Sequence, residues 1–146
     1  MSGARIVVSA RDWIGTPYLH QASVKGAGCD CLGLLRGIWR EVIGPEPEQV
    51  PAYSRDWSEP QGDEALLRAA LRHLRTKCAG DEAPGDVLLF RMREGAVAKH
   101  LGLQARTGAG ASFVHAYSGH GVIESALTLP WRRRLAARFA FPREQD

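Results

Sequence analysis

Apolar residues in the first half of the chain recur every three or four positions, the period of a helix with one buried side. This pattern predicts helices over residues 3–14, 31–42 and 63–78. Gly15 is suited to end the first helix in the left-handed conformation, and Gly44, with the proline after it, stops the second. We therefore expect three amphipathic helices that each bury one face.

The second half of the chain consists of short runs that are apolar or that alternate between apolar and polar residues, as strands do. Glycine-containing connections separate these runs. Because helices come first and strands follow with short loops, the order indicates an α+β domain with helices packed on an antiparallel sheet. The roughly five expected strands cover residues 87–90, 100–105, 112–117, 121–124 and 138–141.

Two stretches between the helices follow neither the helical spacing nor the alternation of a strand. Residues 21–28 contain two glycines and suit a flexible loop, whereas residues 45–62 are rich in proline, glutamate and aromatic residues and suit an irregular excursion. The chain has no internal repeat, and a length of 146 residues is suited to one core. We expect residues 1–146 to form a single domain.

Composition narrows the class of protein. Hydrophobic residues make up 45% of the chain and charged residues 24%, as in an ordinary globular domain. A net charge of +3 is too small to indicate nucleic-acid binding, and no apolar run is long enough for a membrane span. The N-terminus does not follow the pattern of a signal peptide, so we expect synthesis in the cytoplasm. The three cysteines are predicted to be free thiols.

The most informative segment is residues 28–34, where a loop with a glycine leads through Asp30 and Cys31 into the second helix. Asp30 is a good N-cap residue, and a thiol at a helix N-terminus lies in a positive field that favours the thiolate. The first backbone N–H groups of the helix are also free to hold an oxyanion. Cys31 is therefore a candidate nucleophile on the core side of the helix, with Cys29 as a weaker rival and a buried structural thiol as the alternative.

Two histidines on expected strands are candidate partners for this thiol. His100, Gly102 and Gln104 share one strand face, and this polar face is typical of a sheet that lines a cleft. His100 can take the thiol proton as a general base, and His115 on the next strand can fix its tautomer. The alternative is that these are ordinary core or surface histidines.

A zinc site is a further alternative for the same residues. Cys29, Cys31, His100 and His115 have the right ligand types, although two cysteines separated by one residue are not a usual zinc spacing. The catalytic interpretation needs no metal and no cofactor.

Five motifs in order resemble the NlpC/p60 family of cysteine peptidases, which are papain-like enzymes that cut bacterial cell-wall peptides. The resemblance covers most of the chain and implies the NlpC-type fold, with N-terminal helices on an antiparallel sheet. The motifs are Gly15-Thr16-Pro17-Tyr18, Asp30-Cys31-Leu32-Gly33-Leu34, Pro84-Gly85-Asp86, His100-Leu101-Gly102 and Phe113-Val114-His115-Ala116.

The resemblance also implies residue roles. Cys31 is expected to be the nucleophile, His100 the base and His115 the orienting residue. Tyr18 is expected to line the cleft near the thiol, although a packed turn aromatic is an equal alternative, and Asp30 to engage the free amine of the substrate as well as capping the helix. The implied substrate is a peptidoglycan stem peptide, commonly cut between D-glutamate and a diamino acid.

Two departures from the family pattern point to one branch of it. Leu32 stands where most members have serine, and His20-Gln21 stands where many have two glycines. Both resemble the branch found in phage tails and gene transfer particles, and His20 is counted among the expected substrate-binding residues. The run 131–134, with one tryptophan and three arginines, is interpreted as a solvated face, with docking onto a tail protein or an anionic wall polymer as the alternative.

The leading hypothesis is a cell-wall cysteine endopeptidase that works through an acyl-enzyme and is delivered to the periplasmic wall by a phage-like tail. Its expected partners are stem peptides and tail or hub proteins, and it is expected to be virion- or tail-associated. The alternatives are a structural tail-hub subunit with weak or dispensable activity, and an amidase or acyltransferase of the same fold.

Overall fold

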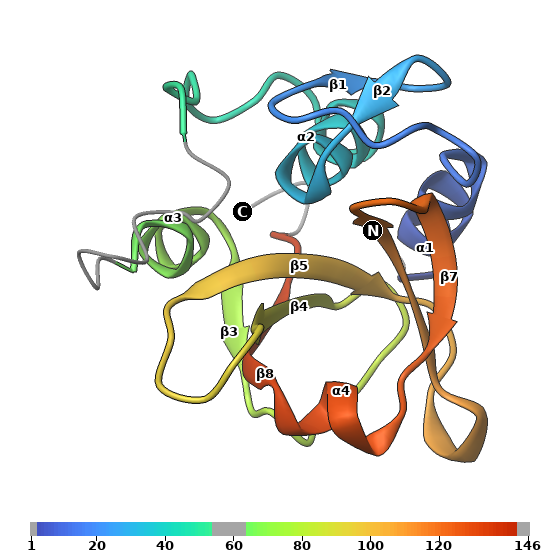
Figure 1. Cartoon of the computed structure of the whole chain (residues 1–146), viewed down its shortest axis with the longest axis vertical. Coiled ribbons are helices and arrows are strands. Elements are labelled where there is room, and N and C mark those ends of the chain that lie inside the picture. Colours follow the sequence, from blue (N-terminus) through green and yellow to red (C-terminus); the bar gives the residue numbers. More distant parts are fainter. Residues whose placement is uncertain (1–2, 54–63, 143–146) are drawn as a thin grey trace.

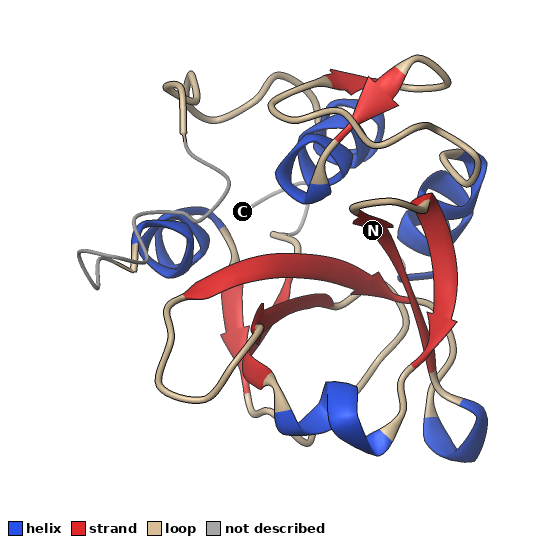
Figure 2. Ribbon diagram, in the orientation of Figure 1, coloured by secondary structure: helices blue, strands red, loops and turns tan. Residues whose placement is uncertain are grey.

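The computed structural model describes residues 3–53 and 64–142. A twisted antiparallel sheet of six strands, in the order β3-β8-β4-β5-β6-β7, forms the centre of the molecule (Figures 1 and 2). The helices are α1 (Gly3–Asp12), α2 (Cys31–Val42), α3 (Ala65–His73) and α4 (Leu129–Arg133). The strands of this sheet are β3 (Arg75–Lys77), β4 (Val87–Arg91), β5 (Ala98–Gln104), β6 (Ser112–Tyr117), β7 (Gly121–Ala126) and β8 (Leu135–Ala140).

The α+β prediction is confirmed, with corrections to the third helix and to the number of strands. The helix expected over 63–78 ends at His73, since Leu74 is already extended with ψ of 159°. Residues 75–77 then pair with β8 as a sixth strand, in which Thr76 faces Phe139. Backbone pairing along the free edge of β8 therefore outweighs the helical spacing. The start expected at Asp63 lies outside the described residues.

The segment 21–28 is not the flexible loop that its glycines predicted. It folds into a small hairpin of β1 (Ser23–Val24) and β2 (Gly28–Cys29), which the Arg40 guanidinium fastens to α2 by donating to the Ser23 carbonyl at 2.7 Å. A side chain at Gly33 would place its Cβ only 1.8 Å from the Ala22 carbonyl oxygen. The glycine that follows Cys31 by two positions therefore lets this hairpin lie against the first turn of α2.

The apolar face of α2 packs on the sheet, beside α1. Leu34 and Ile38 are fully buried against Leu101, Val114 and other residues of the sheet. None of the helices in residues 3–53 and 64–142 is both long and apolar enough to cross a membrane.

A second, smaller core covers the opposite face of the sheet. Phe90 and Phe113 are fully buried there and pack against Leu127 and the half-buried Trp131 of α4. Trp131 is therefore not part of a solvated face, which corrects that interpretation for the first residue of the run 131–134. Exposed Arg133 still fits it.

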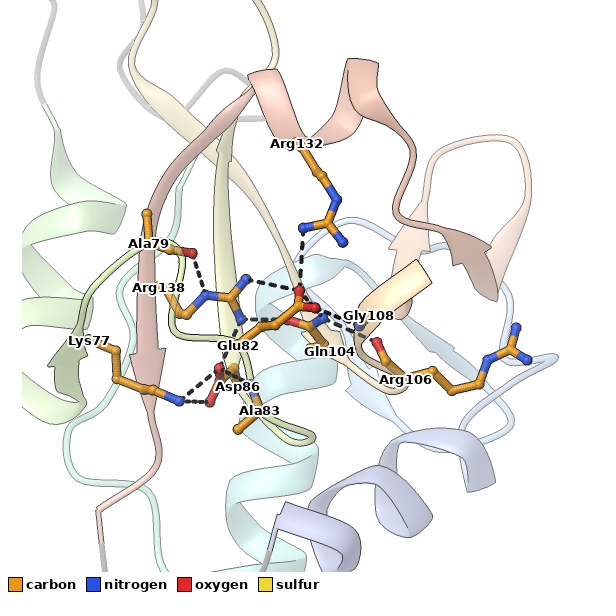
Figure 3. Close-up of polar contacts among 10 residues, drawn as sticks. All are labelled: Lys77, Ala79, Glu82, Ala83, Asp86, Gln104, Arg106, Gly108, Arg132 and Arg138. Carbon is orange, nitrogen blue, oxygen red and sulfur yellow. Dashed lines mark hydrogen bonds and ion pairs between the residues drawn. The ribbon is translucent and has the colours of Figure 1, made fainter. Parts of the chain in front are cut away.

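A buried polar network lies at the Gln104 end of β5 (Figure 3). Arg138, which is 1% exposed, donates to the Asp86 carboxylate at 2.8 Å and to the side-chain oxygen of Gln104. Lys77 adds a second cation 2.9 Å from Asp86. The strand face of Gln104 predicted that it lines a cleft, which is wrong: its side chain is fully buried and hydrogen bonded to Arg138 of β8 and to Glu82 in the loop before β4.

Glu82 connects this network to the surface of the molecule. Its carboxylate accepts hydrogen bonds from the Gly108 backbone N–H at 2.6 Å and from the Gln104 amide at 2.9 Å. Arg132 of α4 reaches the same carboxylate at 3.3 Å (Figure 3). These contacts hold together the loop before β4, the turn after β5 and the short helix α4.

Candidate active site

The start of α2 is built around Asp30. This residue has extended backbone angles, φ −102° and ψ −171°, and its Oδ1 accepts a hydrogen bond from the Gly33 backbone N–H at 2.7 Å. Asp30 is thus the predicted N-cap. Cys31 is the first helical residue, and its side chain is 6% exposed and faces the sheet, as the sequence pattern predicted.

The Cys31 thiol lies against the beginning of β5. Its Sγ is 3.9 Å from the carbonyl oxygen of Lys99, the residue immediately before His100. The backbone N–H groups of Leu101, Leu32 and Cys31 itself lower the pKa of this thiol. The Leu32 and Cys31 donors are the local field that the sequence predicted at a helix start, and the Leu101 donor comes from β5.

Burial nevertheless outweighs that field. Loss of water, followed by the nearby Asp30 carboxylate, raises the pKa of the Cys31 thiol to about 12. The expectation of a resident thiolate is therefore wrong for this closed structure, where the neutral thiol is the stable form. The physical reason is that the helix start faces a dry core instead of solvent.

The two histidines meet where β5 and β6 move apart. The two strands pair at Leu103 with Val114 and at Gln104 with Phe113, and His100 lies beyond this paired part. There, His100 Nε2 is 2.8 Å from His115 Nδ1. The predicted contact between the two rings is present.

Gly102 makes the room for this contact. A Cβ at position 102 would lie 2.8 Å from Phe113 Cδ2 and 3.2 Å from His115 Cβ. The glycine that follows His100 by two positions thus has a packing reason, because a side chain there would displace the neighbouring strand's rings.

Aromatic rings enclose the histidine pair. The His115 ring centroid is 4.2 Å from that of Phe113, and Trp131 packs at 5.8 Å from the His100 ring and 5.4 Å from the His115 ring. Burial, followed by the charge of His115, lowers the pKa of His100 to about 3. Burial, followed by the charge of His120, lowers the pKa of His115 to about 4. Both rings are therefore neutral near pH 7.

The Cys31 thiol of α2 contacts Lys99 of β5, the residue next to His100, whose ring meets His115 of β6. No hydrogen bond joins Cys31 to His100 in the part of the chain that the structure describes, since the thiol contact is to the residue before it. His100 uses Nε2 for His115, which leaves Nδ1 as the nitrogen available for a proton. Both groups are neutral, so the described residues hold no thiolate–imidazolium ion pair between Cys31 and His100.

The predicted substrate-binding residues His20 and Asp30 lie together with Tyr53, which sequence analysis did not select. Asp30 Oδ2 accepts hydrogen bonds from the Tyr53 hydroxyl at 2.5 Å and from the Gln21 backbone N–H at 2.7 Å, and His20 Nδ1 is 3.7 Å away. Burial, followed by the Asp30 hydrogen bond, raises the pKa of Tyr53. The Asp30 carboxylate is thus already occupied, and a substrate amine there must compete with the Tyr53 hydroxyl.

Tyr53 also closes over His20 and Gln21. Its carbonyl oxygen is 2.9 Å from His20 Nε2 and accepts from the Gln21 amide at 2.6 Å, and the Tyr53 and His20 rings pack edge to face. The described end of the excursion after α2 therefore covers this corner, next to the nucleophile. An isolated tyrosine in an irregular stretch gave no sequence signal for this role.

Tyr18 is placed by its backbone pairing with the residue before Asp30. It forms an isolated parallel bridge with Cys29 and packs, partly buried, against the core. Cys29 itself is fully buried, and burial raises the pKa of its thiol to about 12, so it is no better placed as a nucleophile. The three cysteines are free thiols, as predicted.

Two residues of the histidine site were not selected from the sequence. Ser125 Oγ on β7 is 2.9 Å from His115 Nε2, and Trp131 of α4 packs over both histidine rings. The tryptophan could have been suspected as the one apolar residue of its arginine run. A lone serine on a strand offers no such signal.

A separate cavity of about 440 Å³ lies between α2, α3 and the sheet. Its described lining includes Leu32, Leu35, Val50, Leu66 and Phe139, and it does not include Cys31 or His100. In residues 3–53 and 64–142, no group of three or more histidine, cysteine, aspartate or glutamate side chains is arranged to hold a metal ion. The four residues of the zinc alternative do not form one ligand set.

The fold matches solved structures, although the sequence alone gives no match. No protein-family model and no curated protein matches the sequence. An NlpC/P60 family protein from Bacillus cereus matches the structure with a TM-score of 0.66 and 19% identity, over 97% of this chain and 40% of that one. An NLP/P60 family protein from Staphylococcus aureus, described as similar to lipoprotein, gives 0.62 and 16%, over 97% and 41%.

A third match covers a whole domain. The NlpC/p60 domain of the peptidoglycan hydrolase SagA matches with a TM-score of 0.60 and 20% identity, over 97% of this chain and 100% of that one. The chain spans about two fifths of the length of the Bacillus and Staphylococcus proteins. At these identities the shared property is the fold, which is that of NlpC/P60 domains.

Proposed function

We propose that this chain is a cysteine endopeptidase of the NlpC/P60 type that cleaves peptidoglycan stem peptides. The observation that carries the proposal is the placement of the Cys31 thiol, at the start of α2, against the residue before His100, whose ring is bonded to His115. The NlpC/p60 domain of a peptidoglycan hydrolase has the same fold, which supports a cell-wall substrate. The proposed bond is that between D-glutamate and a diamino acid.

The reaction begins from neutral groups. The Cys31 sulfur attacks the carbonyl carbon of the peptide while its proton passes to His100 Nδ1, and backbone N–H groups at the start of α2 hold the oxyanion. The carbon–nitrogen bond then breaks, and the leaving amine takes the proton from His100. Water hydrolyses the thioester with His100 as base, which releases the carboxylic acid and restores the thiol. His115 holds the His100 ring throughout.

We also propose delivery by a phage-like tail. Leu32 beside the nucleophile and His20-Gln21 beside Asp30 are the residues that support this branch. Mass spectrometry of tail particles purified from the source bacterium tests it, because the chain should co-purify with tail proteins through a density gradient. Recovery only in the soluble lysate would contradict tail delivery without affecting the peptidase assignment.

One observation favours the alternative of a structural tail subunit. Cys31 and His100 are only 6% and 7% exposed, so substrate must open the site before reaction. A structural subunit with dispensable activity would show the same buried Cys31 and His100 side chains and no turnover.

The decisive experiment is digestion of purified muropeptides by the wild type and by Cys31→Ala, read by mass spectrometry. The wild type should cleave and identify the bond, whereas Cys31→Ala should give no product while keeping its circular dichroism spectrum. Cys78→Ala is the matched control, since that cysteine is exposed and far from the site in sequence. Equal product from the wild type and Cys31→Ala would remove the assignment of the nucleophile, and no product from either would favour the structural subunit.

A further inference from the structure

The His115 ring is hydrogen bonded on both sides. Its Nδ1 meets His100 Nε2 at 2.8 Å, and its Nε2 meets Ser125 Oγ at 2.9 Å. Within residues 3–53 and 64–142, these are the two polar partners of the ring, which is itself fully buried. Ser125 stands on β7 directly opposite Phe113 of β6, so backbone pairing fixes its position.

The surrounding rings leave His115 little freedom. Phe113 packs at 4.2 Å between centroids, Tyr117 at 5.3 Å and Trp131 at 5.4 Å. The plane of the imidazole is thereby set by packing. What packing cannot set is which of its nitrogens carries the proton, because apolar contacts do not distinguish the two tautomers.

The role of Ser125 follows from which ring nitrogens of His100 and His115 carry a hydrogen. For His100 to accept a proton on Nδ1, its Nε2 must carry a hydrogen and donate it to His115 Nδ1, which must then be an acceptor. The single proton of neutral His115 therefore lies on Nε2, where it needs an acceptor of its own. The Ser125 hydroxyl oxygen is that acceptor, and its own hydrogen can turn toward solvent because Ser125 is half-buried.

We propose that Ser125 is a positioning residue that holds His115 in its Nε2–H tautomer and, through it, keeps His100 ready to take the thiol proton. This rests on the proposed peptidase function for its catalytic consequence, but the tautomer is a property of the folded chain alone. The relay thus runs from the reacting thiol through His100 and His115 to Ser125, across β5, β6 and β7.

The test compares the wild type with Ser125→Ala, Ser125→Thr and, as a matched control at an exposed serine, Ser118→Ala. Nitrogen-15 NMR of the ring nitrogens reads the tautomer directly. Wild type, Ser125→Thr and Ser118→Ala should show a protonated Nε2 on His115, whereas Ser125→Ala should show a mixture of tautomers or the Nδ1–H form. An unchanged His115 tautomer in a folded Ser125→Ala protein would overturn the proposal.

Kinetics on muropeptides supplies the second readout. Loss of one hydrogen bond that supports the base should lower kcat by about threefold to tenfold and leave KM unchanged. Ser125→Thr should recover the wild-type kcat because it restores the hydroxyl. A loss of kcat that threonine does not restore would show a merely structural role. If the wild type itself cleaves nothing, the proposed function fails, and the NMR comparison still decides whether Ser125 sets the tautomer.

Discussion

Buried polar residues lie at both ends of one face of β5, and they are charged at one end and neutral at the other. At the Gln104 end, Arg138 and Lys77 bind the Asp86 carboxylate, so each buried charge has an opposite charge within about 3 Å (Figure 3). At the His100 end, aromatic rings and a second histidine surround the imidazole, and burial keeps it neutral. Only three residues of β5 lie between His100, which belongs to a pair that can exchange a proton, and Gln104, which belongs to a permanent ion network.

The difference follows from what each end contributes to the molecule. Charges that are buried and paired are costly to disturb, which suits the attachment of β8, the loop before β4 and the turn after β5. Neutral histidines in a dry pocket hold little charge at rest, and they can accept a proton when a thiol is ready to give one. Substitutions at the His100 end should therefore change activity, and substitutions at the Gln104 end should change stability.

The largest expected effect is at His100. His100→Gln keeps a similar size but removes the general base, so kcat on muropeptides should fall by about 100-fold to 10,000-fold. The free energy of unfolding in urea should change little, because the site is neutral and no ion pair is broken. A stability loss large enough to explain the missing activity would contradict the division between the two ends.

Arg138→Met should have the largest effect on stability. It leaves Asp86 buried with one cation fewer, and such a loss costs about 3–5 kcal/mol. Urea unfolding measures it, with Arg133→Met as the control, since Arg133 is exposed and its replacement should change stability by less than about 0.5 kcal/mol. The folded fraction of Arg138→Met should keep its specific activity, and a selective loss of kcat would join the network to the active site.

Gly102 lies between the two ends and should affect both. In Gly102→Ala the new Cβ would meet Phe113 at 2.8 Å, so the strain should cost about 1–3 kcal/mol and displace the His115 ring, with a loss of kcat. Gly110→Ala is the control, because a Cβ there meets nothing within 4 Å. If the two alanine variants behave alike, the close packing at Gly102 is not what positions the histidine pair.

Much of the helical part and of the strand pattern could be predicted because local signals determined it. The Asp30 cap and the buried side of α2 follow from residue type and a period of 3.6. Side-chain contacts between strands were harder to predict from the sequence. The Arg138 network depends on sequence positions more than 50 residues apart, such as Arg138 and Asp86, and no local pattern announces such a pairing.

The candidate site shows the same division. Cys31, His100 and His115 were selected because a thiol at a helix start and histidines on strands are chemically conspicuous. The protonation state of the thiol was wrongly expected, because a sequence shows the helix start but not how much of its surroundings is dry. Ser125 was missed because a lone serine on a strand gives no sign that it reaches His115 on the preceding strand, and Tyr53 because it lies in an irregular stretch 23 residues after its partner Asp30.

The smallest expected effect separates the two ends by pH. The folded pKa values of His100 and His115, about 3 and about 4, lie below the ordinary value of 6.5, so the unfolded chain binds more protons as pH falls through 6.5. The contribution of the two histidines to stability is fully present above pH 6.5 and is lost on acidification, by about 0.7 kcal/mol for each histidine between pH 7 and 6.

Glu82 belongs to the Gln104 end of β5. The Gly108 N–H, followed by Gln104, lowers the pKa of Glu82 from 4.5, so its stabilisation is lost only below that pH. Urea unfolding at pH 7, 6 and 4 should show the first slope flattened in a His100→Gln/His115→Gln variant and retained in Glu82→Gln, which should be less stable than wild type at pH 7 and 6 and approach it near pH 4. Equal slopes between pH 7 and 6 in the wild type and the double variant would mean that the histidine pair is not held neutral by burial.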